Sequence, residues 1–506
     1  MGKFQENLRH YMEAGLPILY IDALEYAPVE KILEEAAHSV EPKRTILRWT
    51  PLGLYDEADH SKTQMELDKA LDILLKDKKN LRRRLLIIED VHFFLDKPEI
   101  ISRLRELARL IDAEDEKDRI KDFTVVLVAP LGAIPKELEA YLTIMTPDFL
   151  APDEIKAIIR KFVEENEVPE LVPSFLETLA MEMKGLSEAA IVNILSLAYQ
   201  NDGKIDAADL ELVRDQKKQT VKKSGILEMV EIKESIDDIG GLENLKEWLK
   251  RKAAVFNDSK KAKEYGVDMP KGILLAGMPG CGKSLTAKAA AATFKVPLLQ
   301  LDMGRLMGKY VGDSESNMRR ATQLADASAP CVLWVDELEK AFAGVGGGGS
   351  EVTTRLFGHF LTWMQEKKSM AFVFATANDI SVLPPELLRK GRFDEVFYVD
   401  LPNEAERKKI FEIHIKKRRK DDLESIQEKI DELVAKTEGY CGADIEGVVK
   451  EAVETAFYEG KGKRSLTVED ILKVIDDTHS LSEIMANKLN ELKQSYEDKK
   501  LKKASR

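Results

Sequence analysis

The stretch Gly277–Ser284, GMPGCGKS, decides the fold of the second half of the chain. It matches the pattern G-x-x-x-x-G-K-S/T and stands between a β-rich run, KGILLAG, and a helix-forming run, SLTAKAAAATF. Its three glycines allow the backbone N–H groups to converge, and the helix that follows adds the positive end of its dipole. The stretch therefore predicts a phosphate-binding loop, in which Lys283 reaches the β- and γ-phosphates and the Ser284 hydroxyl binds magnesium.

A pair of acids closes a later apolar run, CVLWVDE, which ends in Asp336 and Glu337. We expect Asp336 to hold the magnesium shell with Ser284, and Glu337 to polarise and orient an attacking water. Asn378 ends the neighbouring run FVFATAN and is placed to hydrogen-bond that water and the γ-phosphate. A lone asparagine at a strand end is commonly a turn former, but its place after the acidic strand favours a catalytic role. These residues predict hydrolysis of the nucleotide as well as binding.

β-rich and helical runs alternate along the chain, which predicts an α/β fold with a parallel sheet covered by helices on both faces. Five strands are expected in the second half: KGILLAG, VPLLQLD, CVLWVDE, AFVFATAND and EVFYVDL. After Leu401 only helical runs follow, which predicts a small helical domain over residues 401–480. Residues 481–506 read as a charged helix with a Lys-rich end, and we expect a solvated tail.

The first half repeats this order of landmarks. Four pairs keep their order and a nearly constant spacing: Glu89 and Asp336, Pro130 and Asn378, Pro135 and Pro385, Ser187 and Gly442. Chance similarity of generic βα units explains this agreement less well than repetition does. The pattern therefore indicates a tandem duplication.

The first copy lacks a phosphate-binding loop. Its counterpart reads GLPILYIDALEYAPVEKIL, where Asp22, Glu25 and Glu30 replace the glycines, the lysine and the hydroxyl. Carboxylates at a helix N-terminus cannot cradle a phosphate, so Glu89 and Asp90 are expected to be structural relics. We predict a degenerate domain over residues 1–225, with an α/β part to about 150 and a helical part over about 151–215. A catalytic α/β domain over 226–400 follows.

Composition excludes several other classes of protein. The chain has 506 residues, 44% of them apolar and 33% charged, which indicates two or three water-soluble domains. No apolar run approaches the ~18 residues needed to cross a bilayer, and the start lacks the apolar core of a secretory signal, so a cytoplasmic location is expected. The net charge of −13 arises in the first half, which disfavours nucleic acid as a partner.

Two arginines in LPPELLRKGRFDEVFYVDLP, Arg389 and Arg392, complete the motif set. With them, the segment from about Ile236 to Asp477 resembles an AAA ATPase domain of the FtsH, p97 and spastin kind. The resemblance implies that both arginines act in trans as arginine fingers on the nucleotide of the next subunit. A homo-oligomeric ring, expected to be a hexamer, follows from this. The fold class expected is thus α/β with tandem AAA-type P-loop domains, each with a helical lid, the first degenerate.

The same resemblance implies the remaining contacts to ATP and Mg²⁺, the expected cofactors. Asp238, Ile239 and Gly240 would meet adenine, and His414 would lie near the base and ribose. Gly442 and Ala443, of the YCGADI turn, would lie beside the nucleotide. The loop itself completes the set of cofactor-binding residues: Gly277, Met278, Pro279, Gly280, Cys281, Gly282, Lys283, Ser284 and Leu285.

Over the whole chain the resemblance is to an AAA group of plastid and cyanobacterial genomes, the hypothetical chloroplast reading frame forty-six ATPases. It rests on GCGKSLTAKA, PCVLWVDELEKAFAG, GVGGGGSEV, FLTWMQEK and the linker KKQTVKKSGILE. The resemblance adds the plastid stroma as an alternative location.

A family of this kind implies a motor that remodels a protein client or threads it through the ring. Tyr310 and Val311 precede a glycine, the order found in the pore loop that grips polypeptide, and Gly344–Val352 falls where a second pore loop is expected. Two alternatives stay open: a nucleotide-dependent assembly switch or scaffold, and a nucleic-acid motor. The last is less favoured because the candidate pore loops offer only Lys309 as a cation.

Overall fold

The computed structural model describes residues 3–23, 25–112, 120–130, 134–223, 225–306, 313–342, 351–389, 391–499 and 501–506. The chain divides into a first unit, Met1–Leu212, and a second unit, Val213–Met307 with Asn317–Arg506. The division falls within helix α9, Leu210–Lys223. Tyr310, Val311 and most of Gly344–Val352 lie outside the described residues. Within the described ranges, no helix is both long and apolar enough to cross a membrane.

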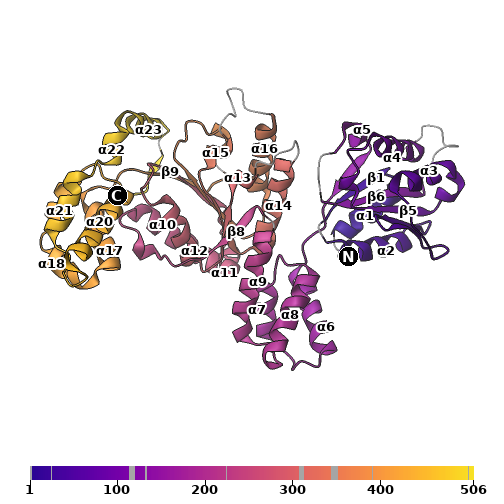
Figure 1. The fold of residues 1–506 in the computed structure, drawn as a ribbon, viewed down its shortest axis with the longest axis horizontal. Helices are drawn as coiled ribbons and strands as arrows, with labels where there is room; N and C mark the ends of the chain where they lie inside the picture. Colours follow the sequence, from indigo (N-terminus) through magenta and orange to yellow (C-terminus); the bar gives the residue numbers. More distant parts are fainter. Residues whose placement is uncertain are drawn as a thin grey trace. The chain divides into compact units, whose positions relative to one another are not determined.

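The first unit begins with a seven-stranded sheet in the order β4-β3-β2-β5-β6-β1-β7. Figure 1 labels strands β1, β5 and β6 of this sheet together with helices α1 to α5. Alternate residues of a strand serve opposite faces: Ile18 and Tyr20 of β1 pack with α3 and α4, while Leu19 and Ile21 pack with α1 and α2. The strands are β1 (Ile18–Asp22), β2 (Thr45–Thr50), β3 (Gly53–Asp56), β4 (Ser61–Thr63), β5 (Arg84–Glu89), β6 (Phe123–Ala129) and β7 (Leu142–Met145). The helices are α1 (Lys3–Ala14), α2 (Tyr26–Ser39), α3 (Leu67–Lys76), α4 (Pro98–Ile111) and α5 (Lys136–Glu139).

A helical part follows this sheet, as the sequence predicts. It comprises α6 (Pro152–Glu165), α7 (Pro173–Glu182), α8 (Glu188–Asp202) and the start of α9. Ser187 begins α8, because its hydroxyl accepts a hydrogen bond from the Ala190 N–H at 3.3 Å.

The second unit contains another seven-stranded sheet, in the order β14-β13-β9-β12-β11-β10-β8. All five predicted strands are present, and two further short strands, β8 and β14, extend the edges. The bounds are β8 (Leu227–Val230), β9 (Gly272–Gly277), β10 (Leu298–Leu301), β11 (Cys331–Val335), β12 (Ala371–Ala377), β13 (Glu395–Val399) and β14 (Lys502–Lys503). The helices are α10 (Glu243–Asn257), α11 (Ser259–Glu264), α12 (Lys283–Phe294), α13 (Met303–Leu306), α14 (Asp313–Ser328), α15 (Leu338–Phe342) and α16 (Glu351–Glu366).

The two sheets share one topology over five strands. The order β7-β1-β6-β5-β2 in the first unit corresponds to β13-β9-β12-β11-β10 in the second. The register agrees as well: Leu85 pairs with Thr124 in the first sheet, and their counterparts Val332 and Phe372 pair in the second. This agreement is what a tandem duplication predicts.

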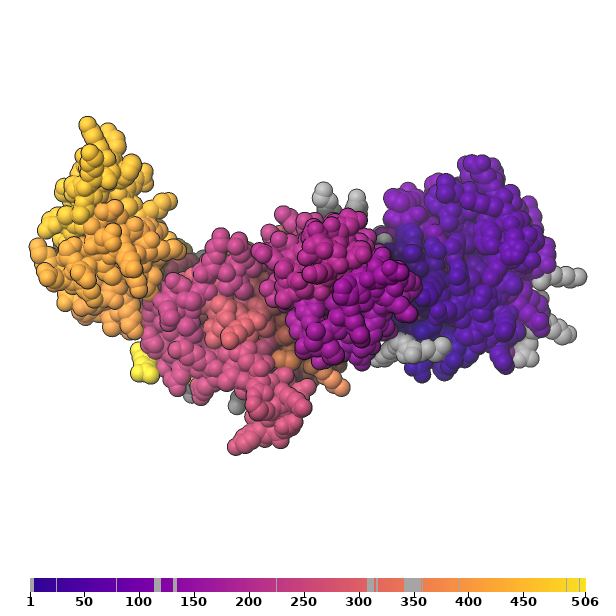
Figure 2. Space-filling model, turned by 90° about the horizontal axis from the view of Figure 1, so that it is seen from below, coloured from indigo at the N-terminus to yellow at the C-terminus, as the bar shows by residue number. Residues whose placement is uncertain are grey.

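The helices of residues 404–477 form a compact lid (orange to yellow in Figure 2). Two of its helices are short and are separated only by Glu428 and Lys429. The bounds are α17 (Glu404–Arg418), α18 (Leu423–Gln427), α19 (Ile430–Ala435), α20 (Gly442–Gly460) and α21 (Val468–Asp477).

The expectation of a solvated tail is wrong. After α22 (Leu481–Ile484), helix α23 (Ala486–Asp498) packs into the core of the second unit through Leu489, Leu492 and Tyr496. These three residues share one helical face among many polar neighbours. Beyond α23, strand β14 pairs with β13 and Ala504 is fully buried on the opposite face of the sheet.

Candidate active site

The loop between β9 and α12 has the backbone that its glycines allow. Gly280 and Gly282 adopt φ values of 71° and 80°, in the left-handed region. A side chain at Gly280 would also collide with the Cys441 sulfur of the lid. The loop is therefore compact, and it lies directly against the first turn of α20, where the Ala443 N–H donates to the Gly280 carbonyl at 3.0 Å.

Lys283 folds back over this loop. Its Nζ donates to the carbonyls of Gly277 at 2.8 Å and Met278 at 2.7 Å. The side chain is buried, and burial lowers the pKa of its ammonium group. The two carbonyls hold the ammonium group at the loop, where it can donate instead to the oxygens of an incoming phosphate.

The predicted magnesium ligands lie side by side at the end of β11. Ser284 Oγ is 3.5 Å from Asp336 Oδ1, and that oxygen also accepts a hydrogen bond from the Thr376 hydroxyl. A hydroxyl and a carboxylate are oxygen donors of the kind that Mg²⁺ prefers in nucleotide sites. The residues present therefore fit this ion.

Thr376 is a site residue that the sequence analysis missed. Its hydroxyl contacts Asp336 and also accepts the Glu337 N–H at 3.1 Å, so it fixes both acids from the neighbouring strand β12. The signal was present, because Thr376 is the one hydroxyl in the otherwise apolar run AFVFATA. Its side chain is fully buried, where a hydroxyl requires a partner.

Glu337 and Asn378 face one another across the ends of β11 and β12. Asn378 Nδ2 lies 3.4 Å from Glu337 Oε1, and Lys340 Nζ lies 2.5 Å from the other carboxylate oxygen. Glu337 has φ of 50°, a conformation uncommon for a residue with a side chain. The pair is thus placed to hold a water beside the Ser284 and Asp336 oxygens.

Glu339, also missed from the sequence, orients Asn378. Its Oε1 accepts the Asn378 N–H at 2.9 Å. Burial raises the pKa of the Glu339 carboxyl, and the hydrogen bond from Asn378 opposes that shift. Glu339 acts on the main chain of Asn378, whereas Glu337 contacts its side chain.

A cavity of about 210 Å³ continues from the loop towards the lid. It brings together ten of the residues that the sequence singled out: Asp238, Ile239, Gly240, Gly280, Cys281, Gly282, Leu285, His414, Gly442 and Ala443. Burial lowers the pKa of His414, while the carboxylate of Glu446 opposes that shift. The mixed apolar and backbone lining suits a planar base.

A further residue of this cavity, Glu406, joins the lid to the segment predicted to meet adenine. Its Oε1 accepts the Leu242 N–H at 3.0 Å. A side chain at Gly240 or Gly241 would collide with Ile410 or Glu406, so both glycines are required for this close approach. Sequence spacing gave no signal for Glu406.

The two predicted arginine fingers lie just after the turn Pro385–Leu388. Arg389 follows the turn Pro385–Leu388 and is exposed, and Arg392 donates to the Glu386 carbonyl of the same turn. The Arg389 side chain is thus open to solvent, whereas Arg392 is held by the turn.

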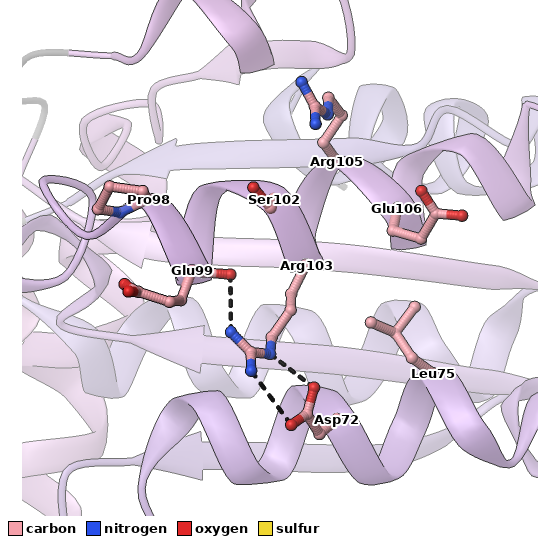
Figure 3. A pocket seen from close by; sticks show the side chains of 8 residues that line it. All are labelled: Asp72, Leu75, Pro98, Glu99, Ser102, Arg103, Arg105 and Glu106. Carbon is pink, nitrogen blue, oxygen red and sulfur yellow. Dashed lines mark hydrogen bonds and ion pairs between the residues drawn. The ribbon is translucent and has the colours of Figure 1, made fainter.

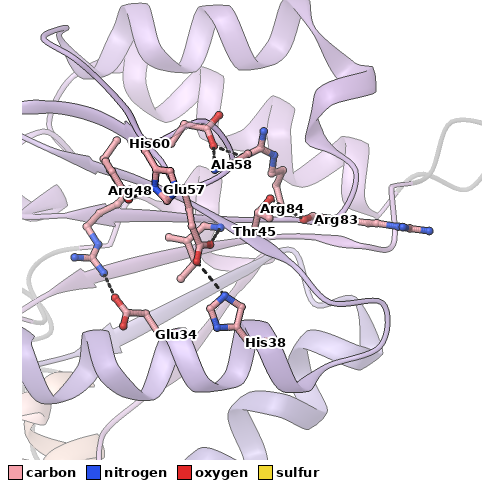
Figure 4. A network of polar contacts seen from close by, with 12 residues as sticks. Glu34, His38, Thr45, Arg48, Glu57, Ala58, His60, Arg83 and Arg84 are labelled. Atoms are coloured by element: carbon pink, nitrogen blue, oxygen red, sulfur yellow. Dashed lines mark hydrogen bonds and ion pairs between the residues drawn. The ribbon is translucent and has the colours of Figure 1, made fainter.

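The corresponding region of the first unit is filled by its own side chains. The Tyr26 hydroxyl donates to Asp90 at 2.7 Å, and the Ser187 hydroxyl donates to Glu25 at 2.8 Å. Arg48 pairs with Glu30 and with Glu34, each at 3.0 Å (Figure 4 shows the pair with Glu34). These contacts occupy the acids that stand where a phosphate loop would begin.

An open groove of about 540 Å³ lies between α3 and α4 of the first unit. Arg103 crosses it to contact both carboxylate oxygens of Asp72, at 2.6 and 3.1 Å (Figure 3). Arg103 is thus already paired within the groove, which Arg105 also lines.

The strand order of the second unit, with an acid beside a loop hydroxyl and a lid over the cavity, defines a nucleotide hydrolase of the P-loop class. The chain belongs to the AAA ATPase family and hydrolyses ATP. A model of the ATPase family associated with various cellular activities matches residues 273–401, and an AAA+ lid model matches residues 427–473. Models of the SpoVK-like AAA ATPase N-terminal and second domains match residues 4–147 and 153–224.

Three relatives illustrate the similarity. The AAA domain-containing protein ycf46 of Guillardia theta is 37% identical over 99% of this chain and 96% of its own length. The ATP-dependent zinc metalloprotease FtsH of Thermotoga maritima is 37% identical over 47% of this chain and 39% of its own. The proteasome-activating nucleotidase of Aeropyrum pernix is 28% identical over 71% of this chain and 86% of its own.

Proposed function

We propose that the protein is an AAA motor that assembles into a homo-oligomeric ring, expected to be a hexamer, and remodels or threads a protein client. One observation carries the proposal of a ring: Arg389 is exposed and Arg392 contacts the Glu386 carbonyl. Glu337 and Asn378, in contrast, face each other at the site. Charge on the transferred phosphoryl group needs a cation, and an arginine from a neighbouring subunit would supply it.

The roles of the site residues follow from their positions. Lys283 exchanges its loop carbonyls for phosphate oxygens, and Ser284 with Asp336 holds Mg²⁺, which supplies charge neutralisation when bound. Glu337 polarises and orients the attacking water, and Asn378 hydrogen-bonds it. Thr376 fixes the position of Asp336, and Glu339 fixes the main chain of Asn378.

A protein client is favoured over the alternatives by the names of two relatives. One is an ATP-dependent zinc metalloprotease and the other a proteasome-activating nucleotidase. The predicted pore residues Tyr310 and Val311 remain predictions, as does the location in the cytoplasm or plastid stroma. The first unit is proposed to bind no nucleotide, since its acids are paired internally.

Electron-microscopic class averages of the Glu337→Gln variant with ATP test the ring, because this substitution should preserve the bound nucleotide. Closed rings support the proposal. A monomer under conditions of saturating ATP would contradict it and favour action of the arginines in cis.

A further inference from the structure

The main chain of Asn378 is held at both of its polar groups. Its N–H donates to Glu339, and its carbonyl accepts a hydrogen bond from the hydroxyl of Tyr496. Two residues further on, the Ile380 carbonyl accepts Lys499 Nζ at 2.8 Å. Tyr496 and Lys499 both belong to the segment after the lid, which thus fixes the turn that carries Asn378.

Packing fixes the direction of the Tyr496 hydroxyl. The ring is 1% exposed and lies against Tyr398 of β13, with ring centroids 4.4 Å apart. Leu492 and Leu489, one and two turns earlier in α23, are buried in the same core. A ring enclosed in this way has few rotamers available, so its hydroxyl is a rigid donor.

The same segment continues to the start of helix α10. The Ala504 N–H donates to Tyr398 at 2.8 Å, and the Ala504 carbonyl accepts the Leu245 N–H at 3.1 Å. Leu245 lies in the first turn of α10, where N–H groups have no partner within the helix. Asn244 Nδ2 donates to the Ser505 carbonyl at 2.6 Å. Helix α10 follows directly on the Asp238–Gly240 segment that lines the cavity.

We propose that residues 485–506, the C-terminal strap, position the catalytic groups of the ATP site, and that Tyr496 is the positioning residue for Asn378. This inference rests on the role proposed for Asn378. The Tyr496 hydroxyl fixes the carbonyl, Glu339 fixes the N–H, and the amide side chain is thereby aimed at Glu337. A shift of a fraction of an ångström in a catalytic group lowers the rate of the reaction but has little effect on how tightly the substrate binds.

Tyr496→Phe tests the proposal in the full-length protein, because it removes the hydroxyl and keeps the ring. We expect kcat for ATP hydrolysis to fall about tenfold with KM for ATP changed less than about twofold, since Tyr496 acts on the placement of Asn378 and does not contact the cavity. The matched control is Tyr398→Phe, which removes a hydroxyl from the other ring of the same pair. That hydroxyl faces Asp400 and not Asn378, so kcat should fall less than it does in Tyr496→Phe.

A double-mutant cycle separates positioning from general destabilisation. If Tyr496 acts through Asn378, adding Tyr496→Phe to Asn378→Ala should lower kcat no further. Wild-type kcat in Tyr496→Phe, an equal loss in Tyr398→Phe, or full additivity with Asn378→Ala would each overturn the inference. Normal turnover in Asn378→Ala alone would instead overturn the role proposed for Asn378, so the two failures are distinguishable.

Discussion

Asp90 and Glu337 follow corresponding strands of the two sheets, and both adopt a left-handed backbone, with φ of 56° and 50°. Such a conformation costs a residue with a side chain on the order of 1 kcal/mol or more. In the second unit it accompanies a carboxylate that faces Asn378, whereas Asp90 accepts the hydroxyl of Tyr26. The first unit thus keeps the backbone turn of a hydrolase site with different side-chain partners.

Glu337→Gln should bind ATP but hydrolyse it at least ~100-fold more slowly, because an amide cannot accept a proton from the attacking water. Phosphate release measures the rate and calorimetry the binding. Lys340→Ala is the control, since it removes only the exposed partner of Glu337 and should retain most turnover. Near-normal hydrolysis by Glu337→Gln would show that another group orients the water.

Lys283→Ala should abolish nucleotide binding by the whole chain. Removal of this ammonium leaves the loop without its cation, and the first unit has Tyr26, Glu25 and Arg48 engaged in internal contacts. Titration calorimetry with ATP and Mg²⁺ checks this. Residual stoichiometric binding by Lys283→Ala would locate a nucleotide site in the first unit and contradict its degeneracy.

Arg389→Ala and Lys283→Ala should each reduce hydrolysis at least ~100-fold, yet a mixture of the two should regain activity. The intact loop of one subunit would then meet the intact arginine of its neighbour. Turnover is measured after the two variants are unfolded and refolded together or coexpressed. Failure of rescue in complexes shown to contain both variants would argue for arginines acting in cis.

Tyr310→Ala separates a threading motor from an assembly switch. If Tyr310 grips the client, the variant should keep most basal hydrolysis and its oligomeric state but lose client-stimulated turnover, because no nucleotide contact has been removed. Unfolding of a fluorescent protein with an unstructured tag gives the second readout. Unchanged stimulation and unfolding would defeat threading and favour the switch or scaffold.

Glu89→Gln should alter how the stability of the first unit depends on pH. Burial, with the nearby Glu30 and Asp90, raises the pKa of Glu89 from 4.5 to about 7, and Arg48 opposes the shift. A carboxyl with a raised pKa stabilises the fold when protonated, so this contribution is present below about pH 4.5 and is lost as pH rises through 7.

Protection factors from hydrogen exchange of the β5 amides measure this effect locally. Between pH 5 and pH 8, wild type should lose more protection than Glu89→Gln, since glutamine stays neutral throughout. Arg84→Gln, whose partner Asp56 lies on another strand, serves as the control. Equal pH dependence in wild type and Glu89→Gln would show that Glu89 is already ionised in the folded protein.

The sequence predicted the sheet of the second unit, and ten of the residues that it singled out line one cavity, because both follow from local patterns. A glycine loop before a helix, acids after an apolar strand and alternating βα runs each depend on neighbours in the chain. The repeat in the first half was visible for the same reason, and the shared register of Leu85 and Val332 agrees with it.

Contacts between distant segments could not be predicted in this way. Glu406 and Tyr496 reach their partners only when the lid and the C-terminal strap fold back on the sheet. The strap carries six lysines among its 22 residues and only a short apolar stripe, a composition that is typical of a solvated tail. The stripe is buried because the rest of the second unit offers it an apolar surface. That surface cannot be inferred from the sequence of the segment itself.

Strand β14 has a consequence for the edge of the second sheet. It pairs with Phe397 and Tyr398 of β13, and Lys502 lies 2.5 Å from the Glu395 carboxylate. Without it, the hydrogen-bonding groups of β13 would be open to any extended chain, as happens at unprotected sheet edges in amyloid and domain-swapped assemblies. Loss of these few residues would therefore leave β13 as a longer, uncovered edge strand open to intermolecular strand addition, and aggregation would accompany any loss of catalysis.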